Sequence, residues 1–174
     1  MSDRIHLPDY IRDVPDFPKP GILFKDITPL LDHPAAFGAS VDRLAEHFRG
    51  ERIDAVAAAE ARGFFFGPPL ALRLGVGFVP IRKPNKLPAE KVGLDYDLEY
   101  GTDRLEVHRD ALTPGRRILL LDDVLATGGT MEACGRLVRQ AGAEVVAYAF
   151  VIELAFLGGR ARLGGAEVFS LLTF

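Results

Sequence analysis

The stretch of this sequence that most restricts the possible folds runs from residue 118 to residue 130. It begins with the apolar run Ile118–Leu121, continues with the adjacent carboxylates of Asp122 and Asp123, and ends in the glycine-containing turn 126–130. A short, fully apolar run is typical of a strand buried in a parallel sheet. Such sheets bind ligands at the carboxyl ends of their strands, and a helix N-terminus offers N–H groups and positive partial charge to an anion. The stretch therefore predicts an α/β fold with a phosphate site at the start of a helix.

Short apolar runs alternate with segments of helical periodicity along the rest of the chain. Strands are expected at residues 53–58, 77–81, 116–121, 145–152 and 167–172, and helices at 34–48, 65–74 and 130–141. Asp32 and His33 are expected to cap the first helix, and Pro68 and Pro69 to lie in the first turn of the second. Strands separated by helices predict a mostly parallel, twisted sheet flanked by helices. The 174 residues have the length of a single domain, 1–174.

The segment from residue 82 to residue 108 breaks this alternation. It starts as a basic, proline-rich stretch and continues as two runs, 94–99 and 105–108, in which apolar and polar residues alternate on either side of Gly101. This pattern predicts a hairpin with one polar face. An insertion of this length is typical of a flexible lid or a partner surface, and a purely structural edge hairpin is the alternative.

Charge, motifs and cysteine content exclude several classes of function. With 21 basic and 24 acidic residues the net charge is −3, which argues against nucleic-acid or membrane-surface partners. Neither GxxxxGK[ST] nor a GxGxxG after a strand occurs, so P-loop and dinucleotide sites are not expected. The chain shows no signal peptide and no membrane-spanning run, and Cys134 is its single cysteine, so a reducing, cytoplasmic location is expected. We expect Cys134 to be a packed side chain, and Phe64–Phe66 to belong to the core.

Residues 118–130 also resemble the phosphoribosyl-pyrophosphate (PRPP) signature of the type I phosphoribosyltransferases. Five other segments are similar to the adenine phosphoribosyltransferase branch of this family: Phe17–Pro29, Glu60–Phe64, Ile81–Lys83, Lys86–Pro88 and Leu98–Gly101. The resemblance implies the type I fold, with an N-terminal base-binding hood at 1–33, a lid at 82–108 and a PRPP-binding loop at 118–130. It also implies the reaction, in which a glycosyltransferase of purine salvage moves the 5-phosphoribosyl group from PRPP to adenine and forms AMP and pyrophosphate.

The same resemblance implies roles for individual residues. It assigns the 5′-phosphate to Ala126, Thr127, Gly128, Gly129 and Thr130, and the ribose hydroxyls to Asp122 and Asp123. It assigns pyrophosphate to Arg62, Arg82, Lys83 and Lys86, and adenine to Leu23, Phe24, Lys25 and Leu154. The two catalytic candidates are Glu99, as the base that takes a proton from adenine, and Arg62, as a clamp on the leaving pyrophosphate. Mg²⁺ is expected to arrive with PRPP, so no protein ligand is assigned to it.

Several alternatives remain open at this point. The basic residues at 82–86 and Arg62 are also explained as solvated surface side chains, and Asp95 and Asp97 are rivals of Glu99 on one strand face. A 6-oxopurine substrate is the alternative to adenine, although the lysine expected to read the 6-oxo group is missing near Glu153. A regulator that senses PRPP is a further alternative, but the chain has no basic face or added domain for nucleic acid. A homodimer is expected from the resemblance and from the apolar region at 64–74.

Overall fold

The computed structural model describes residues 5–98 and 101–174. Its strands are β1 (Arg12–Pro15), β2 (Leu23–Asp26), β3 (Ala55–Ala59), β4 (Gly77–Ile81), β5 (Lys91–Leu98), β6 (Gly101–His108), β7 (Arg117–Leu125), β8 (Glu144–Glu153) and β9 (Glu167–Thr173). The α-helices are α1 (Thr28–Asp32), α2 (Pro34–His47), α3 (Gly63–Leu74) and α4 (Gly129–Gln140). Short 3-10 helices are η2 (Leu7–Tyr10), η3 (Arg109–Ala111), η4 (Ala155–Leu157) and η5 (Gly159–Arg162). No helix within the described ranges is long and apolar enough to cross a membrane.

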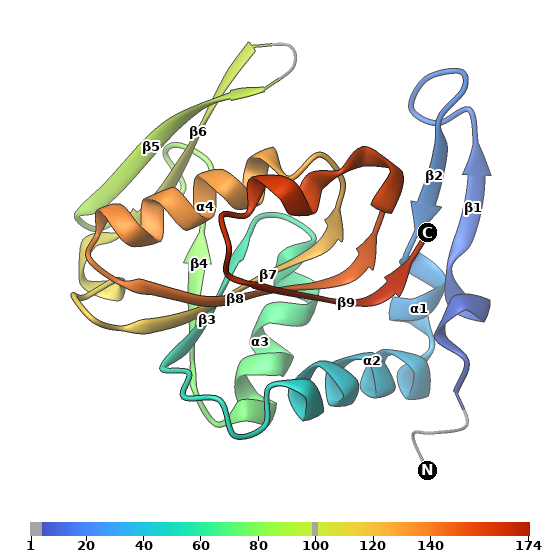
Figure 1. Ribbon diagram of the computed structural model, residues 1–174, viewed down its shortest axis with the longest axis horizontal. Helices are drawn as coiled ribbons and strands as arrows, with labels where there is room; N and C mark the ends of the chain where they lie inside the picture. Colours follow the sequence, from blue (N-terminus) through green and yellow to red (C-terminus); the bar gives the residue numbers. More distant parts are fainter. Residues whose placement is uncertain (1–4, 99–100) are drawn as a thin grey trace.

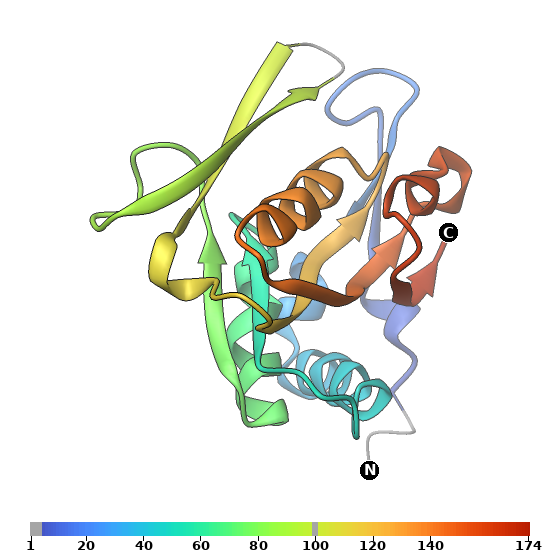
Figure 2. The ribbon, with the colours of Figure 1, turned by 60° about the vertical axis from the view of Figure 1, so that its left-hand side comes forward.

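The centre of the molecule is a five-stranded sheet in the order β4-β3-β7-β8-β9, and all four strand pairs are parallel. Helices α2 and α3 lie on one face of the sheet and α4 lies on the other (Figure 1). Two antiparallel hairpins, β1–β2 and β5–β6, stand on either side of α4 in both ribbon views (Figure 2). The predicted α/β fold with a mostly parallel sheet is confirmed.

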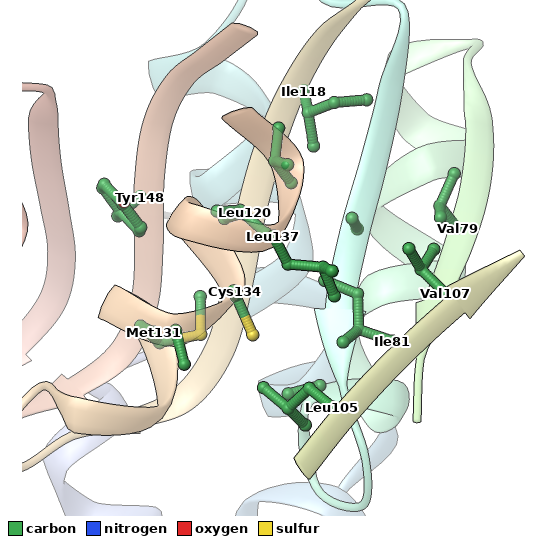
Figure 3. Packing of buried hydrophobic residues seen from close by; sticks show 14 of the residues in the cluster. Val79, Ile81, Leu105, Val107, Ile118, Leu120, Met131, Cys134, Leu137 and Tyr148 are labelled. Carbon is green, nitrogen blue, oxygen red and sulfur yellow. The ribbon is translucent and has the colours of Figure 1, made fainter. Parts of the chain in front are cut away.

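The core has two halves because the central strands are buried on both faces. Ile118 and Leu120 of β7 face α4, whereas Leu119 and Leu121 face α2 and α3, and all four side chains are fully buried. Burying one such side chain contributes about 1.5–3 kcal/mol, which explains the uninterrupted apolar run. Figure 3 shows the α4 side of the core, where Cys134 packs among aliphatic side chains. The expectation that Cys134 is a packed residue is confirmed, and burial raises the pKa of its thiol.

Hairpin β5–β6 contributes to this half of the core. Its strands pair in the predicted antiparallel way, with Leu94 opposite Leu105 and Asp95 opposite Arg104. Leu105 and Tyr96 are buried in the cluster that includes α4, while Asp95 is exposed. The hairpin therefore has the predicted polar face, and its apolar face is anchored on the domain.

Three of the differences from the expected boundaries have a clear local explanation. The cap of α2 is His33 alone, whose Nδ1 accepts a hydrogen bond from the Ala36 N–H at 3.2 Å. Helix α3 begins at residue 63, earlier than expected, so Pro68 and Pro69 lie inside the helix and not in its first turn. Strand β7 continues to residue 125, since the long neighbour β8 keeps pairing with it as far as Glu153. The two carboxylates thus lie within the strand.

The assignment of all three phenylalanines at 64–66 to the core was wrong for one of them. Phe66 is fully buried, and Phe64 packs edge-on against Phe78 with ring centroids 5.6 Å apart. Phe65, in contrast, is 46% exposed, together with Leu72 of the same helix at 81%. Consecutive helical residues point about 100° apart, so three in a row cannot all face one sheet.

Candidate active site

The turn between β7 and α4 is the predicted phosphate site. Gly128 caps the helix with φ +84°, a left-handed conformation that favours glycine. The first N–H groups of α4, from Gly129 to Met131, have no carbonyl one turn earlier in the helix to accept them. These groups and the hydroxyls of Thr127 and Thr130 are suited to an anion, and all five residues of 126–130 line one cavity.

A second segment, for which no role was predicted from the sequence, lies directly against this turn. The backbone of Gly159 in η5 lies so close that a Cβ on Gly128 would be 2.5 Å from its carbonyl oxygen. Conversely, a Cβ on Gly159 would be 2.9 Å from the Gly128 nitrogen and still closer to the Ala126 carbonyl oxygen. Only glycine permits two backbones to approach in this way. The glycine pair at 158–159 was the sole local signal of this contact.

The carboxylates at the end of β7 form a coupled pair. Asp123 is 3% exposed and forms an ion pair with Arg62, in which the Arg62 Nε lies 2.7 Å from the Asp123 Oδ2. The Asp123 N–H donates a hydrogen bond to Asp122 Oδ1 at 2.9 Å. Burial raises the pKa of Asp122, and the neighbouring Asp123 carboxylate raises it further. Burial also raises the pKa of Asp123, opposed by the Arg62 guanidinium. Both carboxyl groups therefore bind a proton more tightly than an isolated aspartate does.

The first cavity, of about 380 Å³, lies between hairpin β1–β2 and the phosphate turn. It is lined by Ile22, Leu23, Phe24, Lys25, Arg62, Asp122, Asp123, Val124, Leu125, Ala126, Thr127, Gly128, Gly129, Thr130, Met131, Leu154 and Leu157. All four predicted adenine-binding residues are thus brought to one cavity. The Phe24 ring packs edge-on against Phe17 at 5.2 Å and lies 5.7 Å from the Arg62 guanidinium. The Lys25 ammonium is engaged elsewhere, 2.6 Å from an Asp13 carboxylate oxygen.

The second cavity, of about 520 Å³, adjoins the first on the side of hairpin β5–β6. Its lining is Glu60, Ala61, Arg62, Lys83, Tyr96, Asp103, Leu105, Asp122, Asp123 and Thr130. Arg62, Asp122, Asp123 and Thr130 line both cavities. Arg82 is adjacent, with its Nε 2.7 Å from the Glu60 carboxylate, whereas Lys86 is exposed and lines neither cavity. Glu99 lies outside the described residues.

Hard oxygen donors are present here, but they are not arranged as a metal cage. Within residues 5–98 and 101–174, no group of three or more His, Cys, Asp or Glu side chains is placed to hold a metal ion. The second cavity nevertheless combines four carboxylates with two cationic side chains, Arg62 and Lys83. Such a site favours an anionic ligand that brings a divalent cation with it.

The fold and the two adjoining cavities are those expected of a phosphoribosyltransferase. In agreement with this, a family model described as a phosphoribosyl transferase domain matches residues 26–162. Adenine phosphoribosyltransferase of Solibacter usitatus is 59% identical over 168 residues, which cover 97% of each chain. The chain belongs to the adenine phosphoribosyltransferase family. A crystal structure of such an enzyme from Thermoanaerobacter pseudethanolicus matches with a TM-score of 0.94 and 52% identity, covering 100% of both chains.

A more distant solved relative comes from Saccharomyces cerevisiae. This adenine phosphoribosyltransferase is complexed with an imino-altritol bisphosphate and adenine. It matches with a TM-score of 0.89 and 45% identity, covering 95% of this chain and 96% of the yeast chain.

Proposed function

We propose that the two adjoining cavities hold the two halves of one reaction, with ribose at their junction. The overall reaction is the transfer of the 5-phosphoribosyl group from PRPP to adenine, which yields AMP and pyrophosphate in purine salvage. The observation that carries the assignment of the cavities is the set of four residues that line both of them. The ribose carbon that changes partner must contact the base on one side and pyrophosphate on the other, which the junction allows.

The first cavity is proposed to bind the product AMP. Ala126, Thr127, Gly128, Gly129 and Thr130 surround the 5′-phosphate, and Asp122 and Asp123 accept hydrogen bonds from the ribose hydroxyls. A carboxylate accepts two such bonds best when ionised. Because burial raises the pKa of Asp122 and so disfavours its ionised form, hydrogen bonds from the ribose hydroxyls are expected to stabilise the carboxylate.

Adenine is proposed to lie at the apolar end of this cavity, against Phe24 and Leu154. Among the described residues strand β2 pairs with β1 alone, so the backbone groups on its other side are available to the edge of the base at Leu23 and Lys25. The adenine and sugar-like bisphosphate named for the yeast relative support a site that takes both groups together. The Lys25 side chain is given no contact with the base, because it is paired with Asp13.

The second cavity is proposed to bind pyrophosphate with Mg²⁺. Arg62 and Lys83 line it and Arg82 adjoins it, so all three are retained as contacts, while Lys86 is retained as a rim residue. Mg²⁺ is proposed to arrive with PRPP, held by phosphate oxygens and water, and no protein ligand is assigned to it. When bound, Mg²⁺ neutralises charge on the departing pyrophosphate.

Glu99 is proposed as the general base, together with Arg62 as the stabiliser of the leaving group. Adenine with a proton on N7 has a free N9 lone pair, and N9 forms the bond to ribose C1′ as the bond to pyrophosphate breaks. The proton on N7 becomes more acidic in this step, and a carboxylate beside it accepts the proton. The lid at 82–108 is proposed to exclude water from this reaction.

The protein is further proposed to form a homodimer in the cytoplasm. Phe65 and Leu72 on α3 expose apolar surface that a second copy of the chain would cover. The one cysteine is buried, as a reducing compartment allows.

The decisive test is an assay with PRPP, Mg²⁺ and each of adenine, hypoxanthine, guanine and xanthine. We expect adenine to be preferred by at least about 10²-fold in kcat/KM, because a 6-oxo group exchanges a donor for an acceptor and leaves buried groups mispaired. Comparable kcat/KM with hypoxanthine would refute the assignment of the base.

A further inference from the structure

Each cation proposed to contact pyrophosphate is already paired with a carboxylate of the protein. Arg62 pairs with Asp123 at 2.7 Å, Arg82 with Glu60 at 2.7 Å, and Lys83 with Asp103 at 3.2 Å. Asp103 is the one of these three acids that belongs to hairpin β5–β6. Lys83 lies in the loop after β4, so this pair connects the hairpin to the sheet across the second cavity.

The Asp103 carboxylate is fixed by two hydrogen bonds and is mostly buried, whereas the Lys83 side chain is more exposed. Asp103 accepts hydrogen bonds from the Arg104 N–H at 2.8 Å and from the Tyr96 hydroxyl at 3.3 Å, and its side chain is 22% exposed. The Lys83 side chain, in contrast, is 54% exposed. Although burial raises the pKa of Asp103, the Arg104 N–H and the Lys83 ammonium outweigh it and lower the pKa below its ordinary value. Asp103 is therefore a fixed negative charge at neutral pH.

A pyrophosphate group in this cavity competes with Asp103 for the same ammonium. An ion pair that is half exposed is weak, so an arriving pyrophosphate with several charged oxygens can take Lys83 from Asp103. The pair is strong enough to orient Lys83 and weak enough to be exchanged.

We propose that Asp103 is a positioning residue that holds the Lys83 ammonium in the second cavity and yields it to pyrophosphate, thereby weakening pyrophosphate binding and favouring its release. The inference rests on the proposed function of this cavity. It adds a residue that acts through Lys83 and touches no reacting atom.

The test is the affinity for Mg²⁺–pyrophosphate, measured by calorimetry on the full-length protein with Asp103→Asn. Asparagine keeps the shape: its Oδ1 can still accept from the Arg104 N–H, and its Nδ2 can donate to the Tyr96 hydroxyl oxygen, so the hairpin should stay folded. We expect the Kd to fall about two- to fivefold, the range that an exposed ion pair contributes, with a lower KM for PRPP. Asp97→Asn is the matched control, because this exposed residue of β5 carries the same charge but lines neither cavity.

A double-mutant cycle separates positioning from simple repulsion. In a Lys83→Met background, Asp103→Asn is expected to leave the Kd within about 1.5-fold, because the group through which it acts has gone. The inference is overturned if Asp103→Asn weakens binding or leaves it unchanged, if Asp97→Asn tightens it equally, or if the tightening persists without Lys83. Failure of the wild-type protein to bind either PRPP or pyrophosphate would instead refute the proposed function.

Discussion

Replacing Gly159 by alanine tests whether the 3-10 segment after β8 sets the geometry of the phosphate turn. Gly159 is absent from the lining of both cavities, so it is not proposed to contact the substrates. Its backbone nevertheless lies directly against Ala126 and Gly128. A single added methyl group therefore acts on PRPP binding only by displacing the turn.

The size of the displacement follows from the contacts of the added Cβ. It would lie 2.9 Å from the Gly128 nitrogen, where ordinary contacts begin at 3.4 Å, and closer still to the Ala126 carbonyl oxygen. Both neighbours are backbone atoms, which cannot turn aside as a flexible side chain does. One of the two segments must shift by roughly 1 Å, and a misplacement of that size typically lowers the rate about 10²-fold. We expect kcat/KM for PRPP to fall by this factor, or about 2.7 kcal/mol.

Steady-state kinetics with varied PRPP, together with calorimetric PRPP titration, measure this effect. Gly164→Ala is the matched control: it lies in the same connection, has φ +66°, and a Cβ there meets nothing within 4 Å. It should cost about 1 kcal/mol of folding stability through backbone strain and leave PRPP affinity intact. If Gly159→Ala binds PRPP like the wild type while remaining folded, the bracing role of Gly159 is wrong.

Two further predictions concern the carboxylates. Folding raises the pKa of Asp122, so above pH about 4 the folded protein binds more protons at this group than the unfolded chain does. The contribution of Asp122 to the free energy of unfolding therefore becomes more unfavourable as pH rises and the group ionises. Asp122→Asn should therefore raise the Tm at pH 7.5, with a smaller gain near pH 4, and weaken PRPP binding; a lower Tm at pH 7.5 would contradict this reasoning. Glu99→Gln should lower kcat at least about tenfold with PRPP affinity nearly intact, and Asp95→Asn and Asp97→Asn should do much less. Wild-type rates for Glu99→Gln in single-turnover experiments would remove Glu99 from the mechanism.

The local sequence was sufficient for the framework of the site. The apolar run at 118–121, the two carboxylates after it and the glycines at 128–129 predict a buried strand, an acidic end and an anion-binding helix start. Each of these signals is contained in consecutive residues, and each depends on the conformational preferences of the residues themselves. Alternation at 94–99 and 105–108 similarly predicted the hairpin and its polar face.

The tertiary structure decided how separate segments meet. The contact of Gly159 with the turn at 126–128, the pairing of Lys83 with Asp103, and the four residues shared by two cavities all join parts of the chain that are distant in sequence. The exposure of Phe65 and the extension of β7 through its carboxylates likewise depend on which neighbours are present. Periodicity says which face of an element is apolar, but the distances between elements come from the packing of the whole core. Local propensity therefore determined the elements and their chemistry, and packing determined which charges face one another in the site.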